Sequence, residues 1–357
     1  MKVAFLAHFR GGSESGILRK VASQTAAWTE LGAQVGLFVA TSPRSAAAWS
    51  EIPAAVSVRT PPDGPLGLLR EREDLAADVR RWLPDVVYAR HGLVYPGILR
   101  LARRFPVVVE VNGDDLAEFR LLSPRRYWLA RLTRGLLLRR AAGLVFVTRE
   151  LAASPSFTGF RRPSVVIGNG FDLASVEPAP PARNPQARLI FLGHPNTPWH
   201  GLEHIAELAA ATPDWQVDVV GPRSEEFDQP IPPNLVVHGL MSGGAYRPLL
   251  ASADVAIGTL KLYRTAMTEA SSLKVREYLA TGLPVILGHR DTDFPDGAPF
   301  LLELENGPRC VLDATPRIRA FVEAWAGRRV PREAIAHLDT RPKEQARLDF
   351  LASVAHA

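Results

Sequence analysis

The sequence predicts an α/β protein with two domains, each built on a doubly wound parallel sheet. Three observations point to this fold class. The chain has 357 residues, which suits two domains of ordinary size that each bury a core. Short apolar runs alternate with helical segments in both halves, as in parallel sheets covered by helices on both faces. The prolines of residues 173–187 lie between the halves and predict a linker there.

The composition predicts a soluble globular protein, because hydrophobic residues make up 46% and charged residues 22% of the chain. Cys310 is the only cysteine, which excludes an internal disulfide framework and fits a reducing compartment. The apolar run that follows Lys2 is too short for a secretory signal or a membrane span. We therefore expect a cytoplasmic protein.

Positive charge gathers in residues 120–149, which contain eight arginines and no acidic residue. Aromatic and leucine side chains alternate with these arginines between Tyr127 and Leu138. The pattern is typical of a basic amphipathic helix that touches the inner face of a membrane. It is equally typical of a helix with a core-facing side and a solvated arginine face. We expect no nucleic-acid partner, because no nucleic-acid-binding module accompanies the stretch.

The first half begins with a strand at residues 2–7, a glycine-rich loop that contains Gly11 and Gly12, and a helix at 17–31. This order begins a βαβ unit, and the glycines let the backbone approach a ligand closely. The prolines between residues 53 and 65 predict irregular connections. Further strands are expected at 35–40, 85–91, 107–111, 144–148 and 164–172, and helices at 66–82, at 96–104 and from 148 onward.

Polar residues follow two of these expected strands. His91 ends one of them, and Asn112, Asp114 and Asp115 follow the next. Polar groups at the carboxyl ends of parallel strands lie where open α/β sheets bind ligands. Two other interpretations stay open, because Asp114 or Asp115 would also serve as a helix cap and a lone histidine is often structural.

The second half repeats the alternation of strands and helices. Strands are expected at 189–193, 217–221, 235–239, 255–258, 285–288 and 310–312. Helices are expected at 202–211, at 246–252 and from 316 to the end.

Residues 265–289 are the most informative stretch of the chain. Glu269 precedes an expected helix over 270–280, and Glu277 lies inside it. Gly282 and Pro284 end the helix, and an apolar strand follows. A helix start offers free backbone N–H groups and a positive dipole end, which favour a phosphate.

Two glutamates separated by seven residues, followed by Leu-Pro-Val-Ile at 283–286, resemble the motif of the retaining nucleotide-sugar glycosyltransferases of glycosyltransferase family 4. The segment 164–172 is similar to the strand and turn that close the N-terminal domain in that family. The resemblance implies the GT-B fold, with two Rossmann-like domains facing a central cleft. It implies an acceptor domain over 1–172, a linker over 173–187, a nucleotide-sugar donor domain over 188–335 and a C-terminal helix in 336–357 that crosses back to the first domain.

The resemblance also implies roles for single residues. Glu277 corresponds to the glutamate that binds ribose, and Glu269 to the glutamate nearest the donor sugar. The family usually has an arginine and a lysine in the donor domain where His194 and His200 stand here. Either these histidines act protonated, or other cations replace them, and we favour replacement. The cations expected to replace them are Lys274 and Arg264, followed by Lys261. The other expected donor contacts are Ser271, Ser272, Leu273, Gly193, Gly239 and Gly12.

The resemblance implies transfer with retention, in which the departing phosphate takes the acceptor proton. Asp291 and Asp293 form an Asp-x-Asp pair, but GT-B proteins stabilise the diphosphate with a helix start and basic residues. No zinc-ligand spacing or phosphate-binding loop is present in the sequence. We therefore expect no metal and no cofactor. The nucleotide-diphosphate sugar is expected to be a substrate.

The acceptor is expected in the first domain. Asn112 stands where many family members have a histidine close to the donor sugar, so we include it among the catalytic candidates. His91, Asp114, Asp115 and Gly11 are the candidate acceptor contacts. A glycan, a lipid-linked molecule or a small molecule would each fit, and a lipid-linked acceptor suits the basic stretch at 120–149.

Two other functions compete with glycosyl transfer. A sugar-nucleotide epimerase of the same fold would turn over the donor without an acceptor. A non-catalytic GT-B scaffold that binds a protein partner would explain the loss of the usual arginine and lysine. The joint presence of Glu269, Lys274 and Glu277 argues against a decayed site.

Overall fold

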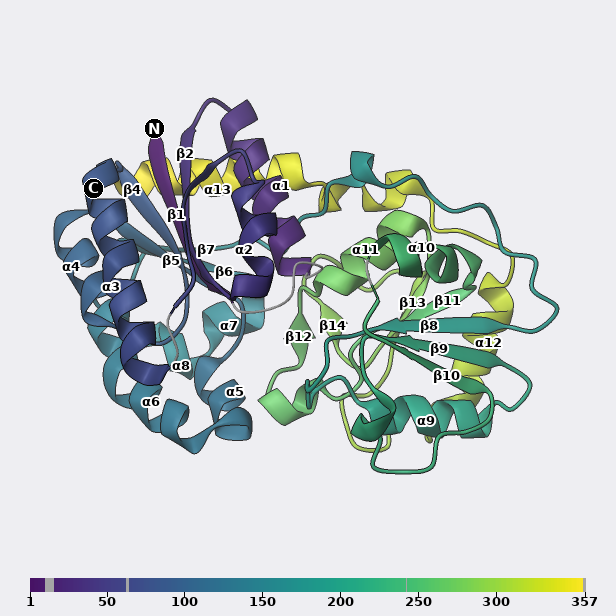
Figure 1. Cartoon of the computed structure of the whole chain (residues 1–357). Helices are drawn as coiled ribbons and strands as arrows, with labels where there is room; N and C mark the ends of the chain where they lie inside the picture. Colours follow the sequence, from purple (N-terminus) through teal and green to yellow (C-terminus); the bar gives the residue numbers. More distant parts are fainter. Residues whose placement is uncertain (10–15, 62–63, 242, 356–357) are drawn as a thin grey trace. The chain divides into compact units, whose positions relative to one another are not determined.

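The computed structural model describes residues 1–9, 16–61, 64–241 and 243–355, and the chain divides into two compact units (Figure 1). Unit 1 comprises Met1–Gly170 together with Thr340–Ala357, and unit 2 comprises Phe171–Asp339. The chain therefore passes into unit 2 after Gly170 and returns to unit 1 at Thr340. Both units are α/β sandwiches, in which a parallel sheet lies between helices.

Unit 1 is built on a parallel sheet with the strand order β3-β2-β1-β4-β5-β6-β7 among its described residues. Its strands are β1 (Lys2–Phe9), β2 (Gln34–Thr41), β3 (Ala55–Arg59), β4 (Val86–Arg90), β5 (Val107–Val111), β6 (Gly143–Phe146) and β7 (Ser164–Val166). Its helices are α1 (Gly16–Glu30), α2 (Pro43–Ser50), α3 (Gly64–Trp82), α4 (Pro96–Arg104), α5 (Asp115–Leu122), α6 (Pro124–Leu138), α7 (Arg149–Ala153), α8 (Pro155–Thr158) and α13 (Thr340–Ala355).

Both faces of this sheet are covered. Side chains of α1, α2 and α13 pack on one face, where Phe5 and Trp28 are fully buried. On the other face, Trp82 of α3 packs edge-on against Phe38, with ring centroids 5.7 Å apart. Leu351 of α13 is buried in the same core as Phe5, although the two residues lie at opposite ends of the chain.

Unit 2 is built on a second parallel sheet, whose strand order is β10-β9-β8-β11-β13-β15 within the described part of the chain. Its strands are β8 (Arg188–Leu192), β9 (Gln216–Val220), β10 (Leu235–Gly239), β11 (Val255–Ile257), β13 (Val285–Leu287) and β15 (Leu301–Glu303), with β12 (Glu269–Ala270) and β14 (Arg290–Asp291) forming a separate parallel pair. Its helices are α9 (Leu202–Ala211), α10 (Gly243–Ser252), α11 (Leu273–Thr281) and α12 (Thr315–Trp325), with short 3₁₀ helices η1 (Leu173–Ser175), η2 (Ser224–Glu226), η3 (Leu262–Thr265) and η4 (Arg332–Leu338).

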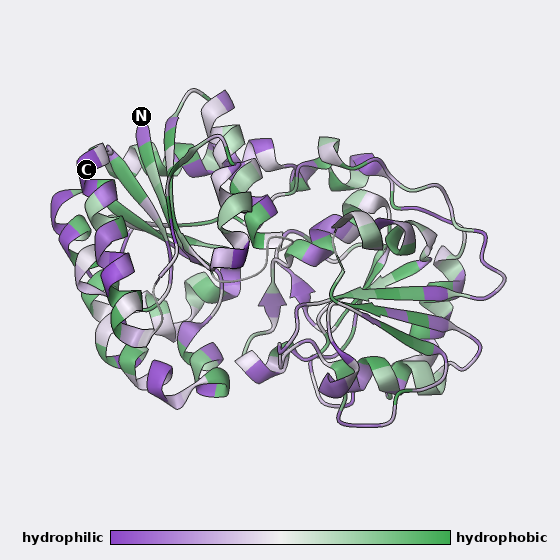
Figure 2. Ribbon diagram, viewed as in Figure 1, coloured by the Kyte–Doolittle hydropathy of each residue, from purple (hydrophilic) through white to green (hydrophobic). Residues whose placement is uncertain are grey.

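Helices cover both faces of this sheet as well. α10, α11 and η4 pack on one face, and α9 and α12 pack on the other. Figure 2 shows the strands of both sheets as largely hydrophobic, while the helices carry polar residues on their outer sides. Strands buried on both faces explain why their sequences read as continuous apolar runs.

The strand orders place the ligand-binding edge of each sheet. In unit 1 the chain runs outward from β1 to β3 and then resumes beside β1 at β4. In unit 2 it runs from β8 to β10 and resumes beside β8 at β11. In open α/β sheets, ligands bind outside the carboxyl ends of the strands at such a reversal. The loops after β8 and β11 are therefore neighbours at the edge where unit 2 would bind a ligand.

The segment 173–187, predicted as a linker, lies against unit 2. The Ala179 amide donates to Thr281 O at 2.9 Å, and the Asn184 side-chain amide donates to Ser252 O at 2.8 Å. The Arg329 guanidinium donates to Ala179 O and Pro180 O from the other side. These hydrogen bonds fix the proline-rich segment along its own unit.

Two local predictions were wrong. The prolines between residues 53 and 65 were predicted to mark irregular connections, but strand β3 forms at Ala55–Arg59. Helix α2, which was not predicted, precedes it. Pro43 begins α2, where its missing N–H is tolerated. A strand was predicted at 310–312, but these residues form turns, and β15 at Leu301–Glu303 pairs with β13 instead. The apolar side chains of Cys310 and Val311 are buried in the core without belonging to the sheet.

Candidate active site

Helix α11 organises the candidate site, and its ends follow from local sequence. Gly282 adopts the left-handed conformation with φ of +90°, and its N–H donates to Leu279 O at 2.9 Å. The Leu283 amide donates to Tyr278 O, which completes a glycine-based helix ending. The helix begins at Leu273 and not at the predicted residue 270, because Glu269–Ala270 pairs with Arg290–Asp291 as strands β12 and β14.

A buried arginine fixes the start of α11. The Arg276 guanidinium donates two hydrogen bonds of 2.7 Å to the Asp291 carboxylate and one of 2.6 Å to Asp293. It also donates to the Ser271 hydroxyl oxygen at 3.1 Å. The Asp-x-Asp pair noted in the sequence thus serves as the partner of an internal cation. This arrangement holds the residues before α11 in a fixed position.

Glu277 lies one turn further along α11 and is buried. Its Oε1 atom accepts a hydrogen bond of 2.8 Å from the Tyr246 hydroxyl of α10. Tyr278, the next residue, accepts a bond of 2.6 Å from the Leu192 amide at the end of β8. These two contacts connect α11 to α10 and to the end of β8.

Lys274 has an unusual environment for a lysine. Its Nζ atom is buried and has no hydrogen-bond partner among the described residues. It lies 4.1 Å from the centre of the Phe191 ring, which gives the ammonium a cation–π contact. Burial lowers the pKa of Lys274 from 10.5 to about 7. The Lys274 amine is therefore held in place with its hydrogen-bonding capacity unused among the described residues.

His289 provides a second buried nitrogen without a partner. Its Nδ1 atom lies 3.1 Å from Thr259 O, whereas Nε2 has no partner in the part of the chain that the structure describes. Burial lowers the pKa of His289 to about 4, and the charge on Lys274 is near enough to contribute. The neutral ring holds its proton on Nδ1 if that atom donates to Thr259 O, which leaves Nε2 as an acceptor.

The loop after β8 contains three predicted donor contacts. Gly193 lies so close to its neighbours that an added Cβ would stand 2.5 Å from the Phe191 ring and 2.9 Å from His200 Nδ1. His200 is buried, and burial, with a contribution from Lys274, holds its pKa well below the ordinary value. His194 is exposed and contacts Pro195 O at 3.0 Å. His200 is consequently a neutral ring at physiological pH.

Backbone hydrogen bonds join this loop to the one after β11. The Leu260 amide donates to His200 O at 3.2 Å, and the Lys261 amide donates to Trp199 O at 3.3 Å. The Lys261 side chain forms an ion pair with Glu203, so its charge is already used within the unit. Arg264, three residues on in η3, is exposed.

The other predicted donor contacts lie on the same unit. Ser272 is the N-cap of α11, and with Ser271 and Leu273 it contributes backbone to the helix start. Glu269 is half-buried on β12. Gly239 ends β10 with φ of +66°, has open space where a Cβ would be, and accepts a bond of 2.7 Å from the Gly221 amide.

The candidates in unit 1 lie at the ends of β4 and β5. The Asn112 side chain donates to Glu110 Oε2 at 2.9 Å and accepts from Lys20 Nζ at 3.3 Å. Lys20 also forms a buried ion pair of 2.7 Å with Glu110. Burial alone would raise the pKa of Glu110, but the charges of Lys20 and of Arg90 hold it well below the ordinary value. Asn112 is therefore part of a buried, neutralised network.

Asp114 and Asp115 also have structural partners, whereas His91 packs edge-on against Phe157 and its buried Nε2 atom has no hydrogen-bond partner among the described residues. Asp114 caps α5 by accepting from the Leu116 and Ala117 amides, and Asp115 forms an ion pair of 3.1 Å with Arg134. Burial lowers the pKa of His91 to about 3 and raises that of Asp115 to about 6. Gly11 and Gly12 lie outside the described residues.

Three side chains of the site were not predicted to act in it. Tyr246 contacts Glu277, Arg276 holds the start of α11, and His289 lies near Lys274. Arg276 lies on α11, and His289 ends the 265–289 stretch. Their positions in the stretch that resembles the family motif could therefore have indicated that they belong to the site. Nothing in the sequence near Tyr246 indicates its contact with a residue 31 positions away.

Comparison with solved structures identifies the fold. The chain is similar to sucrose-phosphate synthase from Thermosynechococcus elongatus, with 15% identity and a TM-score of 0.66 over 99% of this chain and 96% of that one. It is similar to HepE of Anabaena in complex with UDP and glucose, with 17% identity and a TM-score of 0.64 over 99% and 100% of the two chains. UDP-GlcNAc 2-epimerase from Neisseria meningitidis gives 13% identity and a TM-score of 0.57 over 99% and 100%. The fold is GT-B, as predicted.

The sequence comparison adds the class of enzyme. Residues 15–170 match the model of the glycosyl transferase 4-like domain family. A comparison with curated protein sequences finds no match. The family match and the GT-B fold together identify the protein as a glycosyltransferase, which confirms the class predicted from the sequence. In the described part of the chain, no helix is long and apolar enough to cross a membrane.

Proposed function

We propose that the protein transfers a sugar from a nucleotide-diphosphate sugar to an acceptor hydroxyl, with retention at the anomeric carbon. The bond from this carbon to the diphosphate breaks, and a bond to the acceptor oxygen forms on the same face. The acceptor proton passes to the departing diphosphate. The protein's task is to hold the donor and to stabilise the charge that develops on the leaving group.

The observation that carries this proposal is the unused amine of Lys274 beside the start of α11. A buried, unpartnered lysine is unfavourable unless a ligand supplies an opposite charge. The free N–H groups at the start of α11 favour an anion in the same region. The diphosphate is the anionic part of the proposed donor, and Ser271, Ser272 and Leu273 would offer it their backbone amides.

The glutamates would hold the remaining parts of the donor. Glu277 accepts a hydrogen bond from Tyr246 and would also accept from the ribose hydroxyls. Glu269 on β12 would contact the sugar to be transferred. Gly193, which follows β8, and Gly239, which ends β10, would admit the nucleotide close to the backbone. Arg264, exposed in η3, is the second cation that we assign to the leaving group.

We propose that transfer needs no divalent metal. The positive charge would come from Lys274, Arg264 and the start of α11. Asp291 and Asp293 are both engaged by the internal cation Arg276. In the described ranges, no group of three or more His, Cys, Asp or Glu side chains could hold a metal ion.

We assign the acceptor to unit 1 and the protein to the cytoplasm. A glycan, a lipid-linked molecule or a small molecule would serve as acceptor, and the basic residues 120–149 favour one at a membrane surface. Asp114 and Asp115 have internal partners, so their role would be to shape the acceptor region, and His91 would contact the acceptor through its ring.

The first experiment is calorimetric titration of the protein with UDP, GDP, ADP and dTDP, with and without EDTA. We expect micromolar binding of one nucleotide, unchanged by EDTA, and binding about ten- to one-hundredfold weaker in Glu277→Gln, since hydrogen bonds to charged groups contribute about 1.5–3 kcal/mol. The control is Glu323→Gln, an exposed glutamate on α12 of the same unit. Equal binding by wild type and Glu277→Gln would contradict the assignment of Glu277.

The structural similarity to a UDP-GlcNAc 2-epimerase calls for a second control. Donor turnover should be measured with and without an acceptor mixture. A transferase releases nucleoside diphosphate faster when acceptor is present, whereas an epimerase converts the donor sugar without one. Conversion of the donor to its epimer in the absence of acceptor would replace our proposal.

A further inference from the structure

Helix α6 of unit 1 turns a row of large apolar side chains towards solvent. Trp128 is 58% exposed and Leu132 is 75% exposed. Leu136 continues the row, and Leu129 lies beside it, both also exposed. The four-residue spacing of 128, 132 and 136 places these side chains on one face of the helix. A contiguous exposed apolar surface of this kind is typical of an interaction site.

The same helix is strongly basic. Arg125, Arg126 and Arg131 are exposed on α6, and Arg139 and Arg140 are exposed just after its end. No acidic residue occurs between positions 120 and 149. The partner of this surface must therefore accept apolar side chains and carry negative charge. A bilayer that contains anionic lipids has both properties.

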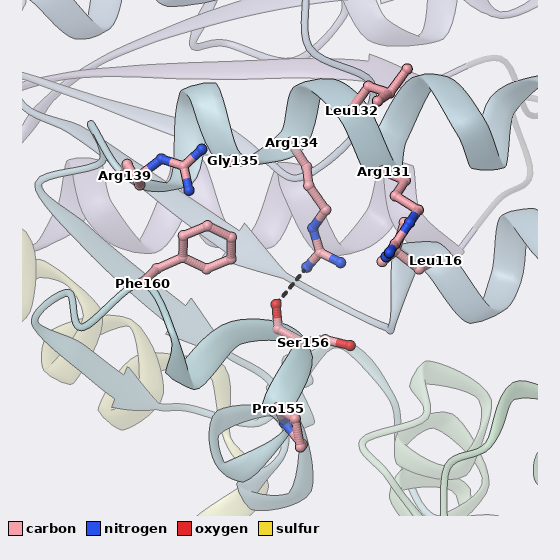
Figure 3. A pocket seen from close by; sticks show the side chains of 9 residues that line it. All are labelled: Leu116, Arg131, Leu132, Arg134, Gly135, Arg139, Pro155, Ser156 and Phe160. Carbon is pink, nitrogen blue, oxygen red and sulfur yellow. Dashed lines mark hydrogen bonds between the residues drawn. The ribbon is translucent and has the colours of Figure 1, made fainter.

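A pocket of about 460 Å³ lies beside Leu132 of this row (Figure 3). It is formed by α5, α6 and α8 and by the residues that follow α6 and α8. Leu132 and Arg139 line both the pocket and the exposed face of the helix. The lining residues are Leu116, Arg131, Leu132, Arg134, Gly135, Arg139, Pro155, Ser156 and Phe160.

Arg134 forms the inner wall of this pocket with an unused donor. Its guanidinium lies 3.1 Å from Asp115 Oδ1 and donates to Ser156 O at 3.2 Å (Figure 3). Its Nε atom is buried and has no hydrogen-bond partner among the described residues. Arg131 and Arg139 stand at the rim and are exposed. Asp115 offsets one of these three charges, so the pocket remains cationic.

Gly135 lines the pocket on the α6 side. An added Cβ at this position would stand 2.8 Å from a terminal nitrogen of Arg139. The Arg139 guanidinium therefore lies close to the helix backbone at Gly135, beside the pocket.

We propose that the exposed face of α6 docks on a membrane that contains anionic lipids, and that the arginine pocket beside it binds a headgroup phosphate. Trp128, Leu129, Leu132 and Leu136 would enter the interface between headgroups and acyl chains. Arg131, Arg134 and Arg139 would surround the phosphate. This inference rests on the proposed function in one respect, the location of the acceptor at a membrane. Binding to vesicles can be measured separately, because it does not require catalytic turnover.

The chemistry of the surface disfavours two other occupants. A second copy of the chain would bring like-charged arginine rows together, which is repulsive. A nucleic acid would satisfy the arginines but would leave the leucine row without an apolar partner. Both alternatives are nonetheless outcomes that the experiment separates.

The test is sedimentation of the full chain with vesicles of phosphatidylcholine alone and of phosphatidylcholine with phosphatidylglycerol. We expect binding only to the anionic vesicles, weakened by salt. Trp128→Ser with Leu132→Ser should reduce binding about tenfold or more, because two large apolar side chains leave the interface. The matched control is Leu66→Ser with Leu69→Ser, two exposed leucines on α3.

A second pair of variants tests the pocket. Arg131→Gln with Arg139→Gln should weaken binding to anionic vesicles about tenfold or more. Arg44→Gln with Arg80→Gln, two exposed arginines on α2 and α3, is the charge-matched control and should bind within about threefold of wild type. Equal losses in the two arginine pairs would mean that net charge alone acts, and would overturn the pocket site. All the substituted residues are exposed, so each variant should keep the thermal unfolding of the wild type, which checks that it folds.

Other results would overturn the docking itself. Binding to both kinds of vesicle, or to neither, would contradict docking on an anionic membrane. A dimer in solution that Leu132→Ser dissociates would assign the surface to a second copy of the chain. Binding to duplex DNA that is tighter than binding to vesicles would assign it to a nucleic acid. Competition by millimolar inorganic phosphate would assign the pocket to a soluble anion. If vesicle binding fails while UDP or another nucleotide still binds, the docking surface is wrong and the proposed donor site stands. If the protein binds anionic vesicles but none of the nucleotides, the docking surface stands and the proposed donor site is wrong.

Discussion

The Glu110 network of unit 1 and the Lys274 region of unit 2 both lie near carboxyl ends of strands, but their buried polar groups are arranged differently. In unit 1, Glu110 is paired with Lys20 and hydrogen-bonded to Asn112, and Asp114 caps a helix. In unit 2, the Nζ atom of Lys274 and the Nε2 atom of His289 are buried without hydrogen-bond partners among the described residues. The Glu110 network is internally satisfied, whereas Lys274 and His289 have donor and acceptor capacity that the described residues do not use.

This difference separates residues that stabilise a unit from residues that are available to a ligand. A buried charge with a partner is costly to disrupt, because removal of one member leaves the other uncompensated. A buried amine without a partner destabilises its own unit and is compensated only when an anion binds. The comparison predicts that the two kinds of site respond to mutation in opposite ways.

The largest effect on stability is expected in unit 1. Glu110→Ala should lower the free energy of unfolding by about 3–5 kcal/mol, because Lys20 would remain buried without its partner. Calorimetric unfolding measures this change, and added nucleotide identifies the transition that belongs to unit 2. Glu323→Ala on α12 is the exposed control. An unfolding temperature equal to that of wild type would show that the Glu110 network does not stabilise unit 1.

Lys274→Met should instead affect catalysis. We expect a fall in kcat on the order of 100- to 1000-fold, since a cation that stabilises developing charge contributes about 3–4 kcal/mol. Donor binding should fall less than turnover, and stability should be unchanged or raised because a buried amine is removed. Arg328→Gln, an exposed charge in the same unit, is the control. Equal losses in kcat and in donor affinity would assign Lys274 to ground-state binding.

The pH dependence of nucleotide binding would sharpen the assignment of Lys274. Its pKa in the free protein is lowered from 10.5 to about 7, and a bound diphosphate favours the charged amine. Binding therefore takes up a proton above about pH 7, and affinity should fall as pH rises, by at most about tenfold per pH unit. In the same range the unfolded chain holds the extra proton, so rising pH should stabilise unliganded unit 2.

Calorimetry in buffers of different ionisation enthalpy measures this proton uptake directly. The uptake should disappear in Lys274→Met. Burial also lowers the pKa of Lys20 in unit 1, to about 8, so the variant is needed to attribute the effect. Proton uptake that persists in Lys274→Met would point to another group.

The smallest effect is expected from Tyr246→Phe. It removes the hydroxyl that donates to Glu277 Oε1 and should weaken nucleotide binding by about tenfold or less, since one such bond contributes about 1–1.5 kcal/mol. Tyr263→Phe is a matched control, because its hydroxyl contacts His204 and not the site. Tighter nucleotide binding in Tyr246→Phe would mean that Tyr246 competes with the ligand for Glu277.

The parts of the fold and site that could be predicted are those set by local chemistry. Gly282 and Pro284 predicted the end of the helix where the structure has it. Gly282 adopts the left-handed conformation and Pro284 lacks an N–H, and both effects act within a few residues. The strand at 107–111 could be located because it is buried on both faces and therefore apolar throughout. Lys274 and Glu277 were assigned to one helix, and the structure places both on α11.

The parts that could not be predicted depend on partners distant in the chain. Leu301–Glu303 and residues 310–312 are both short apolar segments, and only pairing with β13 decides which one is a strand. The start of α11 moved to Leu273 because Glu269 pairs with Arg290 in β12 and β14. Lys261 was a candidate cation for the diphosphate because of its position in the sequence. In the structure its charge is paired with Glu203, a contact that the sequence does not indicate.

The return of the chain to unit 1 at Thr340 has a consequence for the order of synthesis. α13 packs against α1 and β6 and buries Leu348 and Leu351 in the core of unit 1. A ribosome must therefore translate all of unit 2 before unit 1 can close its core. The nascent first unit leaves an apolar face of its sheet uncovered for that interval, while unit 2 emerges as one continuous segment and can fold first.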